Sequence, residues 1–245
     1  MCKVITTSSW KGGTGKTTLN VLTAIILAVW HKLKILIIDL DSNCAISQCF
    51  GMLMKDFTSM EFLSASVENF QGIYKYSDNI DIIPGNIKNV LLNNISDVQL
   101  KINLKRSGLL DRYDYIIIDP PGYVGSHTRN AVFAADVLVI PGTCSRIDFE
   151  ATKLYFNELQ QYGLDAETYI CMNAFNEKTN LPGITELYQG EFGEFLIPWP
   201  VPYIASLKKL TNDVTYPLHT AVRRRLETYV KIITDDSRVI AGGGE

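Results

Sequence analysis

Short runs of consecutive apolar residues recur along the chain, and most of them end at an aspartate, an asparagine or a proline. Residues 35–38 and 115–118 are such runs, and each is followed by an aspartate. Runs without apolar–polar alternation are typical of strands that are covered on both faces. The pattern predicts strands at residues 4–7, 35–38, 80–83, 115–118, 137–140, 169–172 and 195–197.

Segments with helical spacing of apolar residues lie between these strands, at residues 17–31, 130–135, 149–163 and 218–233. Because strands and helices alternate, the chain is predicted to form an α/β fold with a mainly parallel, twisted sheet flanked by helices on both faces. We expect a single domain over residues 1–235. A flexible tail is expected at residues 236–245, where three consecutive glycines stand near the end.

The composition is that of a soluble globular protein. The 245 residues carry 23 Lys and Arg against 26 Asp and Glu, a formal net charge of -3, which excludes a protein that coats nucleic acid with its whole surface. Five cysteines, with no C-x-x-C pair, favour a reducing compartment over a disulfide scaffold. The apolar run 19–30 is too short to span a bilayer, so we expect a cytoplasmic protein.

The most informative segment is KGGTGKTT at residues 11–18, between the first predicted strand and the first predicted helix. Its glycines let the backbone turn tightly and aim N–H groups inward, and the helix N-terminus that follows favours an anion. Lys16 is placed to reach the β- and γ-phosphates of a nucleotide, and the Thr17 hydroxyl can bind Mg²⁺. Trp10 stands where an ordinary Walker A motif has its first glycine. The predicted phosphate-binding residues are Lys11, Gly12, Gly13, Thr14, Gly15, Lys16, Thr17 and Thr18.

The additional lysine, Lys11, makes this segment resemble the deviant Walker A motif of the ParA/MinD family of P-loop ATPases. The resemblance implies a single-domain P-loop NTPase that hydrolyses ATP to ADP and forms an ATP-dependent sandwich homodimer. In that family the early lysine contacts the nucleotide of the partner subunit, which implies that Lys11 acts in trans. With Lys16 it would be a catalytic residue, because a lysine can stabilise the charge that develops on a transferring phosphoryl group.

Acidic residues follow two of the predicted strands. Asp39 and Asp41 resemble the Walker A′ motif of the family, and Asp119 resembles its Walker B aspartate. The resemblance implies that Asp41 is catalytic and orients the attacking water. It also implies that Asp119 and Asp39 join Thr17 at the Mg²⁺ site, with Asp39 nearer to a structural role. Ser42 and Gly122 depart from the family pattern.

Two more positions are assigned to the nucleotide base by the same resemblance. Asn173 ends the predicted strand 169–172, and the carboxyl ends of parallel strands are where ligands bind in such sheets. Pro202 ends a segment, 197–202, that resembles the loop lining the adenine in the family.

The basic residues are concentrated near the end of the chain. Residues 203–233 hold six basic residues and two acidic ones, against the net charge of -3 for the whole chain. Basic side chains gathered on one surface bind nucleic acid through its phosphates, without a sequence code. The predicted DNA-binding residues are Lys208, Lys209, Arg223, Arg224, Arg225 and Lys231.

These features favour a small, Soj-like ParA protein. The sequence begins its phosphate loop within the first dozen residues, and it ends in two aspartates, a serine and a glycine-rich tail rather than a basic amphipathic helix, so we expect no stable membrane association. The resemblance implies non-specific DNA as a partner, a ParB-like centromere-binding protein that stimulates slow hydrolysis, and association with the nucleoid when ATP is bound. A MinD-like positioning ATPase and a non-hydrolysing, nucleotide-dependent interaction module are the alternatives.

Overall fold

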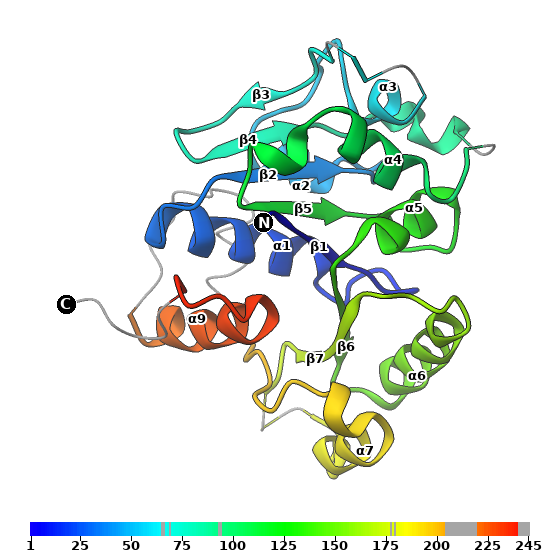
Figure 1. Cartoon of the computed structure of the whole chain (residues 1–245). Helices are drawn as coiled ribbons and strands as arrows, with labels where there is room; N and C mark the ends of the chain where they lie inside the picture. Colours follow the sequence, from blue (N-terminus) through cyan, green and yellow to red (C-terminus); the bar gives the residue numbers. More distant parts are fainter. Residues whose placement is uncertain are drawn as a thin grey trace.

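The computed structural model describes residues 1–64, 67–68, 70–92, 95–176, 178, 180–203 and 220–239. Within these ranges, one sheet has the strand order β3-β4-β2-β5-β1-β6-β7, and only the β3–β4 pair is antiparallel. The predicted α/β fold with a mainly parallel sheet is therefore confirmed (Figure 1). The strands are β1 (Lys3–Thr7), β2 (Ile35–Asp39), β3 (Tyr74–Lys75), β4 (Ile80–Ile83), β5 (Tyr115–Asp119), β6 (Val137–Thr143) and β7 (Glu167–Asn173).

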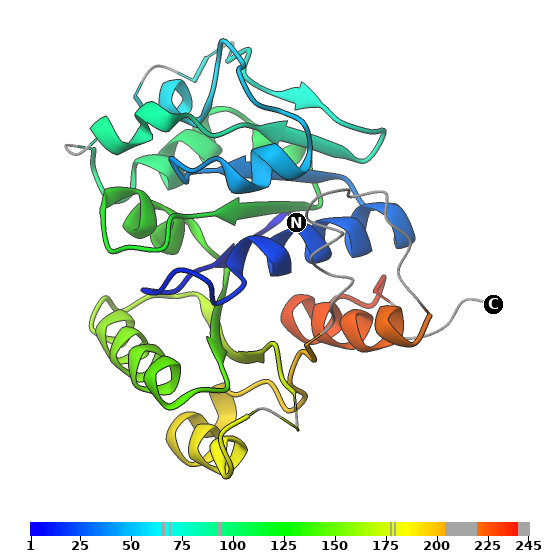
Figure 2. The ribbon, with the colours of Figure 1, turned by 180° about the vertical axis from the view of Figure 1, so that it is seen from behind.

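Each face of the sheet is covered by its own layer of helices. Successive side chains of a strand point to opposite faces, so Ile37 and Ile117 join one hydrophobic core and Leu36 and Ile116 join another. The first core packs under α1 (Lys16–Ile25), α2 (Ala45–Cys49) and α9 (Thr220–Thr234), as Figures 1 and 2 show from two sides. The opposite face carries α3 (Ser59–Ser64), α4 (Gln99–Arg106), α5 (Ser126–Ala134), α6 (Arg146–Gln160) and α7 (Ile184–Phe192).

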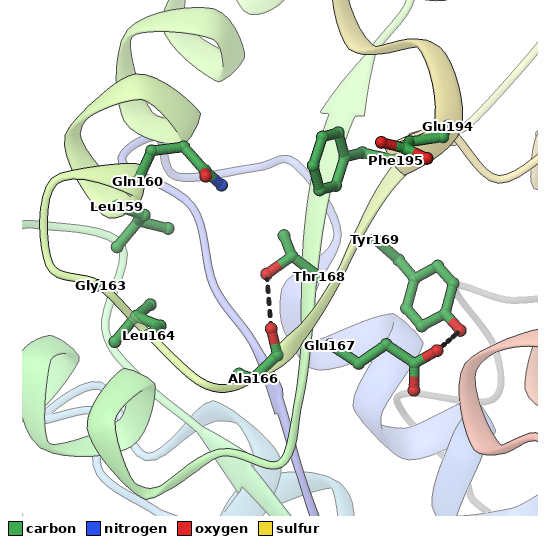
Figure 3. A pocket seen from close by; sticks show the side chains of 10 residues that line it. All are labelled: Leu159, Gln160, Gly163, Leu164, Ala166, Glu167, Thr168, Tyr169, Glu194 and Phe195. Atoms are coloured by element: carbon green, nitrogen blue, oxygen red, sulfur yellow. Dashed lines mark hydrogen bonds between the residues drawn. The ribbon is translucent and has the colours of Figure 1, made fainter.

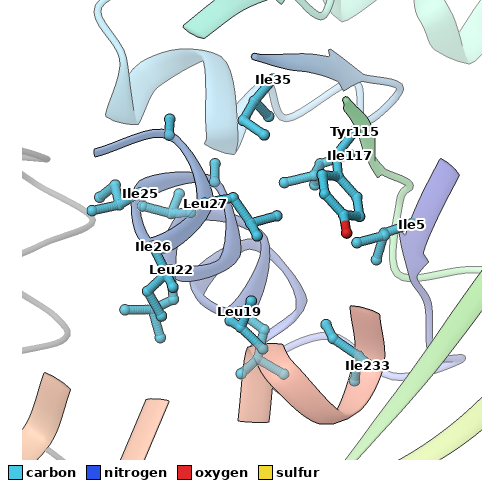
Figure 4. Packing of buried hydrophobic residues seen from close by; sticks show 14 of the residues in the cluster. Ile5, Leu19, Leu22, Ile25, Ile26, Leu27, Ile35, Tyr115, Ile117 and Ile233 are labelled. Atoms are coloured by element: carbon cyan, nitrogen blue, oxygen red, sulfur yellow. The ribbon is translucent and has the colours of Figure 1, made fainter. Parts of the chain in front are cut away.

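Helix α1 lies between the sheet and α9, which explains why every residue from Leu19 to Ile25 is buried, the polar Asn20 and Thr23 included. Leu19 and Leu22 are fully buried, and Figure 4 shows Leu19 beside the helix that carries Ile233 (α9), while Ile35, Tyr115 and Ile117 of the strands lie on the other side of α1. The predicted helix 17–31 is present, but its last part widens into a π-helical segment, Ile26–Trp30. The first helix is thus packed on both sides, and its N-terminus directly follows the loop at residues 11–15.

One predicted strand is wrong, and several short elements were not predicted. Residues 195–197 do not form a strand: Gly193–Phe195 is a 3₁₀ turn, and Leu196 makes only an isolated bridge to Ile170. Pro198, Pro200 and Pro202 follow at every second position and have no N–H to donate, so a regular ladder cannot develop there. The pattern did not identify β3, α2, α3, α4 or α7, nor the 3₁₀ segments Ile87–Leu91 and Leu109–Asp111.

The end of α9 is attached to the amino ends of the central strands. Lys3 donates to the carbonyl of Thr234 (2.8 Å), and the Tyr115 hydroxyl donates to Asp236 (2.6 Å). Val239 is buried in the first core, so residues 236–239 of the expected tail pack against the domain, whereas residues 240–245 lie outside the described part of the chain. No helix in the described ranges is long and apolar enough to cross a membrane.

Candidate functional site

The phosphate loop connects β1 to α1, and its shape requires glycine at one position above all. Gly15 has a φ of 95°, in the left-handed region, and a Cβ atom there would collide with the side-chain amide of Asn173. Gly13 also has a positive φ, of 81°, but no atom lies within 4 Å of the position that its Cβ would take. At Gly15 a side chain would therefore meet both an unfavourable backbone conformation and a close contact, whereas at Gly13 it would meet the unfavourable conformation alone.

Lys16 is enclosed by the loop that precedes it. Its ammonium group lies 3.2 Å from the carbonyl oxygen of Lys11 and 3.4 Å from the Ser9 hydroxyl. Burial lowers the pKa of Lys16, since little water remains to solvate its charge. Gly122 lies so close that a Cβ atom there would be 3.0 Å from the ammonium nitrogen. The departure from the family pattern at position 122 therefore leaves room beside the ammonium group of Lys16.

Asp119, at the end of β5, meets the first turn of α1. Its carboxylate accepts hydrogen bonds from the Thr17 hydroxyl (2.8 Å) and the Asn20 amide (2.7 Å). Burial raises the pKa of Asp119, although these two hydrogen bonds oppose the shift. The structure thus brings together the predicted Mg²⁺ ligands Thr17 and Asp119. A buried carboxylate beside a hydroxyl at a phosphate loop is a suitable pair of hard oxygen ligands for Mg²⁺.

Asp39 is oriented differently, although it lies beside Asp119 in the register of β2 and β5. One of its oxygens accepts from the Asp41 N–H (3.0 Å), and the other accepts from the N–H (3.1 Å) and the hydroxyl (2.5 Å) of Ser47. Burial, and then the charge of Asp119, raises the pKa of Asp39. Its contacts therefore support a structural role at the start of the loop. In the described part of the chain, no three His, Cys, Asp or Glu side chains gather into a metal-binding cluster.

Asp41 follows on a loop that leaves the sheet. Its side chain accepts hydrogen bonds from the N–H (2.9 Å) and the side-chain amide (3.1 Å) of Asn43, and one carboxylate oxygen is left without a partner among the described residues. The Cys44 N–H donates to the Asp41 carbonyl (3.0 Å), and Cys44 itself has a left-handed backbone with a φ of 52°. A turn is therefore closed directly after Asp41, although Ser42 replaces the family's proline.

Lys11 is paired within its own subunit. Its ammonium group forms an ion pair with Asp148, in the first turn of α6. Thr143 and Ser145 both donate hydroxyl hydrogen bonds to the same carboxylate, and Ser145 also caps the helix by accepting from the Asp148 N–H (3.2 Å). These contacts lower the pKa of Asp148 despite its partial burial, so it stays charged. Asp148 was not predicted from the sequence, where its only signal is the helix-capping spacing S-x-x-D.

Asn173 connects the end of β7 to the phosphate loop. Its amide donates to the Thr14 carbonyl (2.7 Å), so this residue, predicted to contact the base, also supports the loop that was predicted to bind phosphate. Pro202 lies in a bridge to Phe175 and lines a hollow of about 580 Å³, together with Trp199, Arg225 and Tyr229. The two residues assigned to the base thus lie on neighbouring segments of the same edge.

The predicted DNA-binding residues are brought together only in part. Lys208 and Lys209 lie outside the described residues. Arg224, Arg225 and Lys231 are exposed on α9. Arg223, on the same helix, forms an ion pair with the buried carboxylate of Glu227 (3.1 Å) and stacks over the Trp30 ring at 4.4 Å from its centroid. Its guanidinium is therefore already engaged within the fold.

Comparison with known proteins agrees with this geometry. A family described as "AAA domain" matches residues 2–166. The cell division protein PomZ of Myxococcus xanthus is 30% identical over 203 residues, which cover 78% of this chain and 63% of PomZ. A virulence plasmid ParA family protein of Chlamydia psittaci is 29% identical over 255 residues, covering 97% of this chain and 98% of that protein. The chain belongs to the AAA-domain family and is ParA-like.

The fold of this ParA-like chain is shared by solved structures. A plasmid partition protein of Borrelia burgdorferi B31, solved with bound AMPPNP, superposes with a TM-score of 0.82 at 22% identity, over 96% of this chain and 99% of that one. The ParA-like motif residues were predicted from sequence, but the residues that hold them in place were not. The supporting residues belong to no recognisable sequence motif, and their contacts are visible only in the folded structure. They are Asn20, Ser47 and Asp148.

Proposed function

We propose that the chain is a ParA-type partition ATPase that binds ATP or ADP with Mg²⁺. The observation that carries the proposal is the convergence at one sheet edge of the glycine loop, the buried Lys16 and the Thr17–Asp119 pair. Thr17 and Asp119 would hold the cation, which supplies positive charge to phosphate oxygens. Lys16 adds a second positive charge inside the loop, and its burial strengthens that electrostatic effect.

In this proposal Asp41 is the catalytic residue that positions the attacking water. One of its carboxylate oxygens has no hydrogen-bond partner in the described part of the chain, and the residue lies two positions beyond Asp39, which is held by three hydrogen bonds. A carboxylate acceptor of this kind orients water in line with the phosphoryl group and typically contributes a factor of about 10² or more. Lys11 contributes from the partner subunit after it leaves Asp148, which makes hydrolysis dependent on the ATP-bound homodimer.

Turnover and nucleotide affinity, measured on the same variants, test this assignment. Lys16→Ala should lose nucleotide binding. Asp41→Ala should keep nucleotide binding and lose turnover by about 100-fold. Asp78→Ala is a matched control, since Asp78 forms an exposed ion pair with Lys75 on the β3–β4 hairpin. If Asp41→Ala hydrolyses ATP as fast as the unchanged protein, the role of Asp41 is refuted.

The cellular part of the proposal rests on the ParA-like sequence and on α9. The ATP-bound homodimer would bind DNA non-specifically through the exposed basic residues of α9, and a ParB-like protein would stimulate hydrolysis. Two copies of a weak basic surface on one dimer bind DNA much more tightly than one copy does. Mobility-shift assays with unrelated duplexes should show binding with ATP and none with ADP. Equal DNA binding with ATP and with ADP would contradict the proposal that ATP binding controls DNA binding.

A further inference from the structure

A hollow of about 410 Å³ lies beside the amino end of β7, the edge strand of the sheet. Asn173, at the other end of this strand, contacts the phosphate loop, and six residues of strand span about 20 Å. The hollow is therefore far from the nucleotide site, and none of the motif residues lines it. Figure 3 shows it between the end of α6 and the first residues of β7.

The outer edge of β7 is free only at its amino end, because residues 196–201 already lie along Ile170 and Met172. The carbonyl oxygens of Ile170 and Met172 accept from Ile197 (2.9 Å) and Val201 (2.8 Å), so even-numbered residues of β7 face away from β6. By the alternation of a parallel ladder, the N–H and C=O of Thr168 also point outward. No loop or helix in the described ranges hydrogen-bonds to these two groups. An exposed pair of this kind is a template for an added strand.

The two sides of the hollow differ in character. Leu164 and Phe195 are partly exposed and form an apolar side, while Leu159 next to them is only 3% exposed and belongs to the core between α6 and α7. Glu167 and Glu194 are exposed, and no ion pair involving either is present in the described structure. In Figure 3, Glu167 lies on the opposite side of β7 from Leu159 and Leu164. A strand added along this edge would present alternate side chains to an apolar side and an acidic side.

We propose that the open edge at Thr168 is a docking site for an extended segment of a partner protein in which apolar and basic residues alternate. The backbone of the segment would exchange hydrogen bonds with Thr168. Its apolar side chains would pack against the partly exposed Leu164 and Phe195, and its arginines or lysines would meet Glu167 and Glu194. Backbone pairing supplies affinity in this mode of recognition, and the two differing sides supply specificity and register.

The inference is independent of the proposed ATPase activity, because it is tested by direct binding to the nucleotide-free chain. The probe is a capped, fluorescently labelled hexapeptide of sequence VRVRVR, titrated by anisotropy. The double variant Glu167→Lys/Glu194→Lys should weaken its binding at least tenfold, because it replaces attraction by repulsion. The matched control, Glu186→Lys, changes the charge of an exposed glutamate on α7 outside the hollow and should leave binding within twofold.

A second variant tests the backbone contact alone. Thr168→Pro removes an N–H that points outward, a position at which an edge strand tolerates proline, and it should also weaken binding at least tenfold. Circular dichroism and thermal unfolding confirm that each variant is folded. The proposal is overturned if VRVRVR does not bind the unchanged protein at 1 mM peptide, if VEVEVE binds equally well, or if Glu186→Lys weakens binding as much as the double variant does.

Discussion

At the scale of single residues, the phosphate loop depends on positions where the side chain is limited by its surroundings. Gly15 is restricted by its own φ of 95° and by the amide of Asn173, which in turn holds the Thr14 carbonyl at 2.7 Å. Gly13 shares the backbone conformation without the contact. Substitutions at Gly13 and Gly15 therefore distinguish two free-energy costs: that of a left-handed backbone, which both share, and that of a collision with Asn173, which only Gly15 has.

We expect Gly15→Ala to destabilise the nucleotide-free protein more than Gly13→Ala does. A left-handed alanine costs about 1–2 kcal/mol, and this cost is common to both variants. Gly15→Ala must also displace Asn173, so its free energy of unfolding should fall further by about 1 kcal/mol or more. Urea unfolding of both variants measures the difference, and equal midpoints would show that the Asn173 contact is not restrictive.

Asp39 makes a second residue-scale prediction, which concerns pH. Burial raises its pKa, so the folded state favours the protonated form. This contribution to stability is complete below the pKa of the unfolded chain, about 4, and is lost as pH rises through the raised folded value. Asp39→Asn keeps the shape without the charge. The stability of this variant relative to the unchanged protein should therefore increase from pH 5 to pH 8, by at most about 1.4 kcal/mol per pH unit.

Urea titrations at the two pH values, without nucleotide or Mg²⁺, measure this difference. Asp78→Asn, an exposed aspartate, is the control. A pH-independent difference between Asp39→Asn and the unchanged protein would mean that Asp39 is ionised at no cost in the fold.

The sequence predicted the residues of the motifs better than it predicted the residues that form hydrogen bonds and ion pairs with them. Lys11, Lys16 and Asp119 could be found because a fixed spacing within a loop, or at a strand end, reveals them. Asp148 and Asn20 could not be found, since their roles arise from contacts between elements that are distant in sequence. The metal role of Asp39 stays a prediction, and its hydrogen bonds to Ser47 and Asp41 favour structural support.

At the scale of elements, α9 shows how one helix divides its charges between packing and solvent. Leu226 and Val230 are fully buried, as the apolar stripe predicted, and Arg223 covers Trp30 while it neutralises Glu227. Arg224, the next residue, is exposed. A cluster of three arginines in the sequence therefore does not correspond to three free charges on the surface.

We expect charge reversal at these two neighbours to have different effects. Arg223→Glu leaves the buried Glu227 facing a second negative charge, and should lower the free energy of unfolding by about 1–3 kcal/mol. Arg224→Glu should leave the melting temperature unchanged and weaken DNA binding, with a shallower dependence on salt. Thermal unfolding and DNA titrations at several salt concentrations distinguish the two. The reverse pattern would contradict the contacts of Arg223.

The sequence was a good guide to elements with long patterns and a poor guide to short ones. The central strands and α9 follow from continuous apolar runs or a helical stripe. Residues 195–197 have the apolar run of a strand, but the alternating prolines that follow prevent pairing, and only the bridge at Leu196 forms. Helix α4 has just eight residues with charges among them, so its pattern is too short to be read.

At the scale of the whole molecule, the ion pair between Lys11 and Asp148 opposes the proposed homodimer. A lysine that acts across the interface must first leave Asp148, which is also held by Thr143 and Ser145. The free subunit is thus stabilised by an ion pair that the proposed dimer loses. The loss of this ion pair makes the free energy of dimerisation less favourable.

We expect Asp148→Asn to form the ATP-dependent dimer at several-fold lower protein concentration, because Lys11 is then free. Glu150→Gln, which breaks the ion pair with Arg146 on the same helix, should leave dimerisation unchanged. Sedimentation at graded concentrations of AMPPNP-loaded protein measures both. Weaker dimerisation of Asp148→Asn would show that Asp148 supports the interface instead.

The place of β1 in the sheet also determines when during synthesis the nucleotide site can form. Strand β1 comes before the other strands of this sheet in sequence, yet it lies in the middle of the sheet, paired with β5 and β6, which begin at residues 115 and 137. The loop after β1 is then supported by Asn173 from the last strand. Such distant pairings form late, after the cost of closing long loops has been met. A ribosome-bound chain should therefore be unable to retain nucleotide until Asn173 has emerged, and the strands made before it need protection from aggregation until then.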